Sequence, residues 1–217
     1  EEAMAFLRIN VKSKNQELVG RLFSAKIIEL ALANYPGFTA SGGSKPGGPI
    51  LIYWPALIDS KHIKEKIHFA GKETEVIPTS QLDLDEVYYQ KTKVDIPPAP
   101  KGKTTLKPLG LVFGARSGDK GGCANLGLWA KTSKAYSFLS EFLTTSKLKE
   151  LLPDLNEFEI DRYELPNILS LNFYIHGILE DGVSSNSRKD GQAKSLGEYI
   201  RAKKVEMPIE IMEDKVE

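Results

Sequence analysis

The residues best suited to chemistry lie in one glycine-rich stretch, which runs from Gly114 to Asn125. It contains four glycines together with an arginine, a lysine, an aspartate and an asparagine, and apolar runs flank it. Glycine permits positive φ angles and a close approach of the backbone to a ligand. Successive amides in such a turn can hold an anion, and Arg116 and Lys120 would add positive charge. The stretch therefore predicts a loop that binds phosphate or carboxylate. The alternative is a β-hairpin with a long glycine-rich loop and no ligand.

Two side chains in the second half of the chain are the candidate catalytic residues. His176 is the only histidine there and is the natural acid or base near neutral pH. Asp119, between Gly118 and Lys120, either forms a turn through its side chain or acts as a general base beside a bound anion. The predicted catalytic residues are His176 and Asp119.

Other polar residues could complete a ligand site. Asn125 either braces the glycine-rich loop or contacts a ligand. Asn172 and His176 are four positions apart in a segment with helical spacing, so they are expected to share a face. The polar stretch 184–189, which includes Arg188, is typical of a solvated loop and would extend an anion site if it lay beside the first loop.

Neither a metal nor a cofactor is predicted. The three histidines are far apart, and no paired Cys/His motif, phosphate-binding lysine motif or dinucleotide fingerprint is present. Cys123 is either a nucleophile activated by the basic residues near it or a small packed thiol.

Composition limits the partners and the compartment. Basic and acidic residues balance at 29 each, which disfavours nucleic acid and anionic membranes as main partners. A single cysteine fits a reducing compartment, so the cytoplasm is predicted, or the mitochondrial matrix in a eukaryote. No apolar run approaches the roughly 18 residues of a membrane span. The N-terminus resembles neither a signal peptide nor an initiator methionine, and a piece of a longer protein is expected.

The first half is expected to be the end of a larger α/β domain. Its predicted elements are a half-buried strand at 6–12, a well-buried helix capped by Ser13 or Asn15 and ending before Gly37, a loop at 39–49, a buried strand at 50–54, and strands at 62–69 and 74–77. The opening strand has no earlier partner, which suggests a sheet completed elsewhere. The proline-rich segment 81–105 predicts an extended linker, with a domain boundary near residue 104.

The second half is predicted to be an α+β domain. After the opening strand–loop–strand, the expected elements are a helix at 133–152, a strand at 158–163, a helical segment at 165–179, a loop at 182–191 that could instead hold an edge strand at 183–188, a helix at 193–202 and a strand at 205–211. This order is typical of a two-layer sandwich of ferredoxin-like type.

Several of these segments resemble the acyclic-terpene-utilisation A-like family. The matching stretches are 115–127, 162–177 and 195–200 in the second half, and 29–38 and 53–57 in the first. Cys123 is a departure, because the family more often has a polar residue there. The resemblance covers nearly the whole chain, and it implies that residues 1–104 finish a large α/β domain while 105–217 form a ferredoxin-like domain.

The resemblance also implies site residues and a biological setting. It adds Ser117, Tyr163 and Asn167, so that the predicted ligand-binding residues are Arg116, Ser117, Lys120, Asn125, Tyr163, Asn167, Asn172 and Arg188. The family is tied to bacterial breakdown of citronellol-type acyclic terpenes through CoA thioesters. The expected partners are a small anionic metabolite or CoA thioester, the upstream part of the same protein, and further copies of the chain in a homo-oligomer.

Two functions follow from these observations. The leading hypothesis is an enzyme, or an enzyme component, of acyclic terpene and acyl-CoA catabolism with an anion-binding glycine-rich loop. The alternative is a non-catalytic assembly module of a larger protein. Convergence of Arg116, Asn125, Asn172 and His176 on one place would favour a ligand site.

Overall fold

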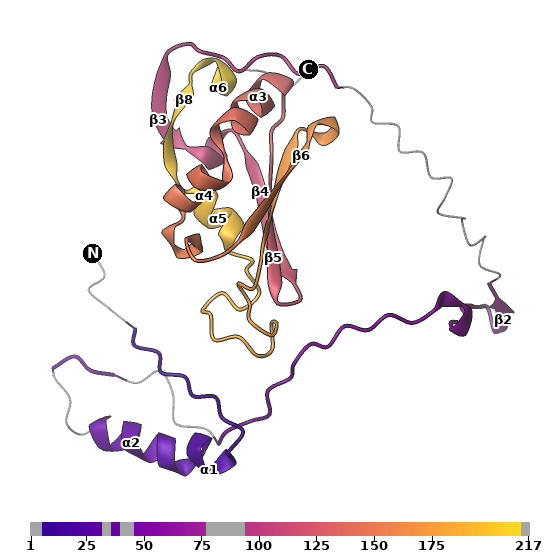
Figure 1. The fold of residues 1–217 in the computed structure, drawn as a ribbon, viewed down its shortest axis with the longest axis vertical. Helices are drawn as coiled ribbons and strands as arrows, with labels where there is room; N and C mark the ends of the chain where they lie inside the picture. The colour runs from indigo at the N-terminus through magenta and orange to yellow at the C-terminus, as the bar shows by residue number, and fades with distance from the viewer. Residues whose placement is uncertain (1–5, 32–35, 40–45, 77–93, 214–217) are drawn as a thin grey trace.

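The computed structural model describes residues 6–31, 36–39, 46–76 and 94–213 (Figure 1). In the first region, residues 6–76, the predicted helix is present as two consecutive pieces, α1 (Gln16–Val19) and α2 (Arg21–Ala31). Asn15 caps α1, because its side chain accepts a hydrogen bond from the amide of Glu17 at 3.0 Å.

A short hairpin is the other regular feature of the first region. It joins β1 (Lys66–Phe69) to β2 (Lys72–Glu75) across a turn at Ala70 and Gly71, close to the prediction, and a 3₁₀ turn, η1 (Ser60–His62), precedes it. The strands predicted at 6–12 and 50–54 are wrong, since neither segment forms a β-strand in the described structure. The predicted burial of the helix is also wrong, because α1 and α2 contain no buried residue. Part of the predicted loop at 39–49, the end of the helix and most of the predicted linker lie outside the described residues.

The second region, residues 104–213, holds a complete α+β fold, which confirms the predicted class. Its elements in chain order are β3 (Thr104–Pro108), η3 (Leu109–Leu111), β4 (Gly114–Lys120), β5 (Cys123–Trp129), α3 (Ser133–Phe142), α4 (Thr145–Leu151), η4 (Pro153–Leu155), β6 (Ile160–Leu165), η5 (Pro166–Ile168), β7 (Ser170–Ile175), α5 (Leu196–Arg201), β8 (Lys204–Pro208) and α6 (Glu210–Glu213).

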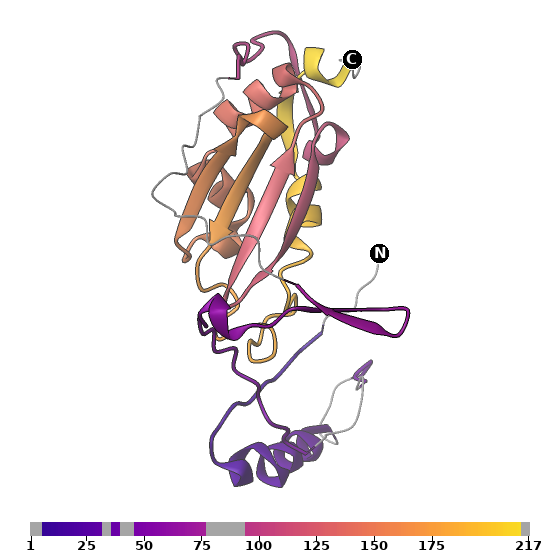
Figure 2. The same cartoon turned by 90° about the vertical axis from the view of Figure 1, so that its right-hand side faces the viewer.

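Four of these strands form one antiparallel sheet in the order β4-β5-β7-β6, while β3 and β8 pair separately. Helices α3, α4 and α5 lie on one face of the four-stranded sheet (Figures 1 and 2). At this face β5 contributes Ala124, Leu126 and Leu128, and β7 contributes Leu171, Phe173 and Ile175, all fully buried. Alternate residues point to opposite faces of a strand, so the intervening positions of β5 and β7 lie on the face that these helices leave uncovered.

Two predictions about local structure are corrected by this sheet. The glycine-rich stretch is not a loop but two paired strands joined by a two-residue turn at Gly121 and Gly122. Gly121 has a φ of +64°, and a Cβ on Gly122 would lie 2.2 Å from the carbonyl oxygen of Glu180, so the tip requires glycine at both positions.

The segment predicted as a helix at 165–179 is instead the 3₁₀ turn η5, the strand β7 and a following turn, because its apolar residues also alternate with a period of two. The alternative of an edge strand at 183–188 is likewise absent from the described structure.

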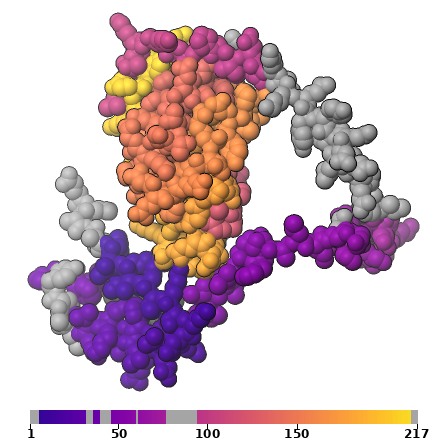
Figure 3. All heavy atoms as spheres, viewed as in Figure 1, coloured from indigo at the N-terminus to yellow at the C-terminus, as the bar shows by residue number. Residues whose placement is uncertain are grey.

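The two regions touch at the turn that follows β7. Lys12 forms an ion pair with Glu180 at 2.6 Å, and the amide of Tyr53 donates to the carbonyl oxygen of Asp181 at 3.4 Å. Figure 3 shows the first region, in indigo and purple, against this end of the second region, in orange.

Candidate functional site

The open face of the four-stranded sheet, meaning the face without α3, α4 and α5, gathers most of the polar residues singled out in the sequence. The strand register places Arg116, Gly127, Asn172 and Tyr163 side by side across β4, β5, β7 and β6. The next row along the strands is Gly118, Asn125, Tyr174 and Asp161. Neighbouring strands are about 4.8 Å apart, so the backbones at Arg116 and Asn172 are separated by about 10 Å.

Glycine at position 127 puts no side chain in the row between Arg116 and Asn172, and we call this missing side-chain position the hollow at Gly127. Arg116 and Asn172 flank it, and a Cβ at Gly127 would lie 3.7 Å from the carbonyl oxygen of Arg116 and 3.9 Å from Oδ1 of Asn172. These are ordinary contact distances, so the hollow can be filled without moving the sheet. Asn125 donates from Nδ2 to Oδ1 of Asn172 at 3.4 Å, which aligns the two amides beside it.

A histidine–carboxylate pair lies farther along the same face. Nε2 of His176, just beyond β7, is 2.8 Å from Oδ2 of Asp161 on β6, and both side chains are partly exposed. The contact with the carboxylate through Nε2 orients the imidazole ring. Tyr163 lies beside the pair, with its hydroxyl 3.5 Å from Oδ2 of Asp161.

Tyr174 and Cys123 border this pair. The ring of Tyr174 meets the His176 ring edge-on, with centroids 4.9 Å apart. A hydrogen bond with the Cys123 thiol, aided by burial, raises the pKa of Tyr174 above its ordinary value of 10.0, so its hydroxyl keeps its proton to a higher pH than an ordinary tyrosine does. Cys123 also accepts a weak hydrogen bond at Sγ from the amide of Gly177 at 3.5 Å.

Ser117 and Asp119, by contrast, belong to the helix-facing side of β4. Ser117 is buried and its hydroxyl accepts a hydrogen bond from the amide of Gly197 at 2.9 Å, which fastens the start of α5 to the sheet. Asp119 is paired with Ala124 and borders a small cavity of about 510 Å³ between the hairpin and residues 51–53. The structure therefore separates both residues from Arg116.

Three other predicted ligand residues lie at the margins or elsewhere. Lys120 lies on the same face of β4 as Arg116. It is at the hairpin tip, however, and its Nζ donates to the carbonyl oxygen of Asp119 at 2.9 Å. Asn167 is exposed in η5, at the end of the sheet opposite His176. Arg188 places its guanidinium 5.9 Å from the centre of the Phe158 ring.

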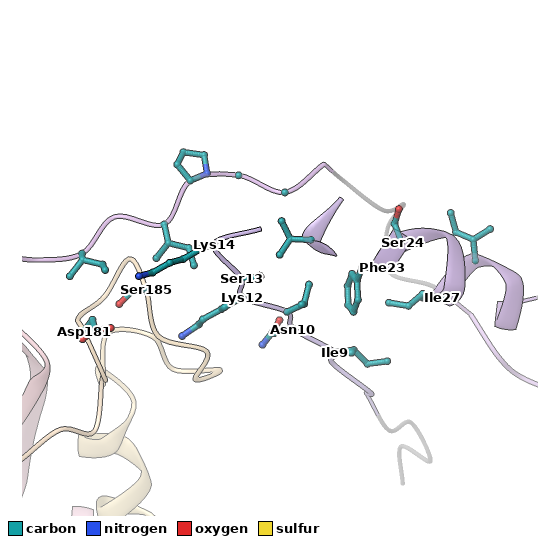
Figure 4. A pocket seen from close by; sticks show the side chains of 18 of the residues that line it. Ile9, Asn10, Lys12, Ser13, Lys14, Phe23, Ser24, Ile27, Asp181 and Ser185 are labelled. Carbon is teal, nitrogen blue, oxygen red and sulfur yellow. The ribbon is translucent and has the colours of Figure 1, made fainter. Parts of the chain in front are cut away.

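A large cavity lies outside the sheet. It has a volume of about 1140 Å³, and its walls are the apolar face of α2, residues 9–14 and 47–52, and the turn at Asp181 and Ser185. Figure 4 shows Phe23 and Ile27 on its helical side and Lys12 and Lys14 toward the turn. None of the residues predicted to bind or react lines this cavity.

Two family models match the chain. One is described as the AtuA ferredoxin-like domain and matches residues 108–206. The other is described as acyclic terpene utilisation family protein AtuA and matches residues 1–69. The chain belongs to the AtuA-like family. Among curated proteins and solved structures, nothing matches it.

For this AtuA-like chain, the second region is thus a ferredoxin-like domain, and the family associates the protein with acyclic terpene utilisation. In the part of the chain that the structure describes, no group of three or more His, Cys, Asp or Glu side chains could hold a metal ion. No helix among the described residues has the length and apolar character needed to cross a membrane.

Two residues of the open face, Asp161 and Tyr174, were missed in the sequence. Asp161 and Tyr163 are two apart in a segment correctly predicted as a strand, so the period of two already places them on one face. Tyr174 would have been found by the alternation of residues 170–175, in which Leu171, Phe173 and Ile175 are the apolar members. The pairing of Asp161 with His176 depends on the register between β6 and β7, which local sequence does not reveal.

Proposed function

We propose that the open face of the ferredoxin-like domain binds a small anion of acyclic terpene catabolism, a carboxylate or a CoA thioester, and that His176 exchanges a proton with it. The observation that carries this proposal is that Arg116, Asn125, Asn172 and His176 all lie on one face of the sheet, although they are up to 60 positions apart in the chain.

Each residue has a role that fits its position. Arg116 supplies the positive charge, and charged donors form the stronger hydrogen bonds to oxyanions. The aligned amides of Asn125 and Asn172 offer further polar atoms beside the hollow at Gly127. His176, oriented by Asp161, is the acid or base, and the Tyr174 hydroxyl next to it can donate a hydrogen bond.

This proposal replaces backbone amides with side chains as the anion-binding groups. The amides of the glycine-rich stretch were expected to hold the anion, but 114–120 and 123–129 form a paired antiparallel ladder. The side chains of Arg116, Asn125 and Asn172 lie on the uncovered face, which supports a role for them in contacting a ligand.

The test is calorimetric titration of the full chain with acetyl-CoA. Arg116→Ala should weaken binding about tenfold to a hundredfold, the range for losing a hydrogen bond to a charged group. Gly127→Leu should do the same by filling the hollow. Lys107→Ala is the matched control, because it removes a positive charge from the exposed side of β3, which belongs to the other sheet. Equal affinity in all four proteins would refute the proposal.

A second function, assembly, is favoured by the surface of the first region. Trp54 and Leu57 are almost fully exposed, at 87% and 104%, and many other large apolar side chains of residues 6–69 are also uncovered. Such a surface marks an interface. We propose that it packs against the upstream part of the same protein or against further copies of the chain. The native mass of the chain, before and after Trp54→Ser with Leu57→Ser, tests whether this surface mediates association between copies.

A further inference from the structure

The cavity of about 1140 Å³ beside α2 is bordered by two extended segments of the first region, residues 9–12 and 50–53. Neither segment contains a helix, a turn or a strand bridge in the described structure. Ile50 and Ile52 line this cavity, whereas Leu51 and Tyr53 border only the smaller cavity near the hairpin tip. Side chains that alternate between two sides in this way are typical of a β-strand.

The first segment presents similar side chains to the same cavity. Ile9 and Val11 line it together with Phe23 and Ile27, which belong to the apolar face of α2. Figure 4 shows Ile9, Phe23 and Ile27 near one another at one end of the cavity. The cavity thus has the walls of a sheet covered by a helix, with an extended segment on each side.

The two segments run in the same direction, toward the turn that follows β7. Lys12 forms its ion pair with Glu180, and the amide of Tyr53 donates to the carbonyl oxygen of Asp181, the next residue of that turn. Figure 4 shows the first segment running from Ile9 to Lys12 toward Asp181. Because α1 and α2 lie between the segments in the sequence, the order is that of a helical crossover between parallel strands.

The backbone of both segments is unpaired where they border the cavity. Among the described residues, the N–H and C=O groups of 9–11 and 50–52 form no hydrogen bond with each other or with any other group. An extended backbone with free donors and acceptors is an edge to which a further strand can add. Two such edges flank this cavity.

The size of the cavity fits one strand. A five-residue strand with side chains on both faces fills a slab of about 800 Å³, given the usual rise per residue, the spacing between strands and the thickness of a packed layer. The cavity holds that volume with some space to spare. A crossover can also leave room for one strand between the two that it connects, and the unpaired segments have that arrangement.

We propose that the cavity beside α2 binds a β-strand of a polypeptide partner, which adds between residues 9–12 and 50–53 and is covered by α2. This inference rests on the second proposed function, assembly through the surface of the first region, and names the element that binds there. The partner strand has free backbone groups on both edges, no proline and apolar side chains on the face toward α2, because both neighbours offer hydrogen bonds and α2 offers apolar contacts.

The test is amide hydrogen exchange of the full chain, measured by NMR, with the peptide acetyl-Lys-Val-Ile-Val-Thr-Val-Lys-amide as the probe. Exchange should slow about tenfold or more at alternate residues of 9–11 and of 50–52, since each of those amides gains a hydrogen bond. Exchange in the β4-β5-β7-β6 sheet should not change. The same peptide with N-methyl groups on two alternate amides keeps its side chains but should bind about tenfold more weakly.

Matched variants locate the binding site. Ile9→Glu with Ile52→Glu should weaken peptide binding about tenfold or more, because burying either charge beside α2 is unfavourable. Both side chains are more than half exposed in the chain alone, so the fold should tolerate the changes. Phe69→Glu is the control, since Phe69 is an equally exposed apolar residue of β1 that does not line the cavity. It should leave the affinity unchanged.

Three outcomes would overturn the inference. One is an absence of peptide binding, and another is binding that leaves exchange at 9–11 and 50–52 unchanged or is insensitive to N-methylation. The third is slower exchange at these residues when the chain is concentrated without peptide, because a second copy would then fill the cavity. The native mass of Trp54→Ser with Leu57→Ser tests the assembly function without the peptide, so assembly can stand when the partner strand fails.

Discussion

Helices α2 and α3 carry similar apolar stripes in sequence but have very different surroundings. In α3, the residues Ala135, Tyr136 and Leu139 are buried against the four-stranded sheet. In α2, no residue is buried, and Phe23, Ile27 and Ala31 face an open cavity instead. Both stripes have the spacing of a helix that packs on something, yet only α3 has its partner among the described residues.

The same contrast holds for the two regions as wholes. Every buried apolar residue from Leu109 to Ile211 belongs to one core, built by strands and helices of the second region. The first region leaves its apolar residues on the surface, and residues 6–12 and 50–54 have strand-like sequences but no strand partner in the described structure. Local sequence therefore encodes which face of an element is to be buried, whereas burial itself requires the partner element.

The largest expected effect comes from separating the regions. Residues 104–217 expressed alone should unfold in one cooperative transition, because all the buried residues of their core lie within that range and only Ile96 packs against it from outside. Residues 1–76 alone should show no cooperative transition, since they bury too little apolar surface to offset chain entropy. Circular dichroism during thermal unfolding measures both. Cooperative unfolding of the 1–76 fragment, or non-cooperative unfolding of the 104–217 fragment, would contradict the conclusion that only the second region has its own core. It would also contradict the predicted boundary near residue 104.

A matched pair of phenylalanines sharpens the comparison within the intact chain. Phe173 on β7 is fully buried, and Phe23 on α2 is only partly covered. Phe173→Ala should lower the free energy of unfolding of the second region by about 3–5 kcal/mol, the usual cost of an emptied aromatic core position. Phe23→Ala should lower it by less than about 1 kcal/mol. Urea titration followed by far-ultraviolet circular dichroism gives both values, and similar losses would contradict the assignment of Phe23 to a partly covered surface.

A pair of glycines tests how the hairpin tip packs against the 177–182 turn, which is the turn that contacts the first region. Gly122→Ala places a Cβ against the carbonyl oxygen of Glu180, and should cost about 1–3 kcal/mol of stability through overpacking. Gly118→Ala is the control, because a Cβ there meets nothing within 4 Å and should change stability by no more than about 0.5 kcal/mol. If the two substitutions were equally harmless, the hairpin tip would not be packed against the 177–182 turn.

Much of the second region could be predicted because its local signals agree with its tertiary structure. The helix expected at 133–152 is present as α3 and α4, interrupted near Thr144, whose side chain caps α4. The segment 165–179 could not be assigned from sequence in the same way, since Leu171 and Ile175 satisfy the periods of both a helix and a strand. Pairing with β5 and β6 decides in favour of the strand.

The sequence identified many residues of the candidate site but not how they are arranged. Asn172 and His176 share a face in the strand as they would in a helix, because four positions is close to one helical turn and is two full strand repeats. Arg116 and Ser117 were expected to act together as neighbours in a loop, but a strand sends adjacent residues to opposite faces. One therefore faces the open side, while the other holds α5.

The smallest expected effect is the pH dependence of the ion pair that joins the two regions. The hydrogen bond from Lys12, with help from the amide of Ser187, holds the pKa of Glu180 below its ordinary value of 4.5. A carboxylate whose pKa is lowered by folding stabilises the folded state above pH 4.5, and this contribution is lost as the pH falls through the lowered pKa. Both side chains are partly exposed, so the effect should be at most about 1 kcal/mol and should shrink with added salt.

Thermal unfolding of the wild type and of Glu180→Gln between pH 3 and pH 7 measures this effect. The wild type should have the higher melting temperature near neutral pH, and the two melting temperatures should become equal at the acid end. Protonation of Glu180 removes the ion pair from the wild type at low pH, whereas the substitution removes it at every pH. Glu150→Gln, which breaks the pair with Lys147 inside α4, is the matched control, since that pair lies within one region. One outcome would contradict this prediction: Glu150→Gln changes the pH dependence of the melting temperature and Glu180→Gln does not. In that case the ion pair between Lys12 and Glu180 does not join the first region to the second in solution.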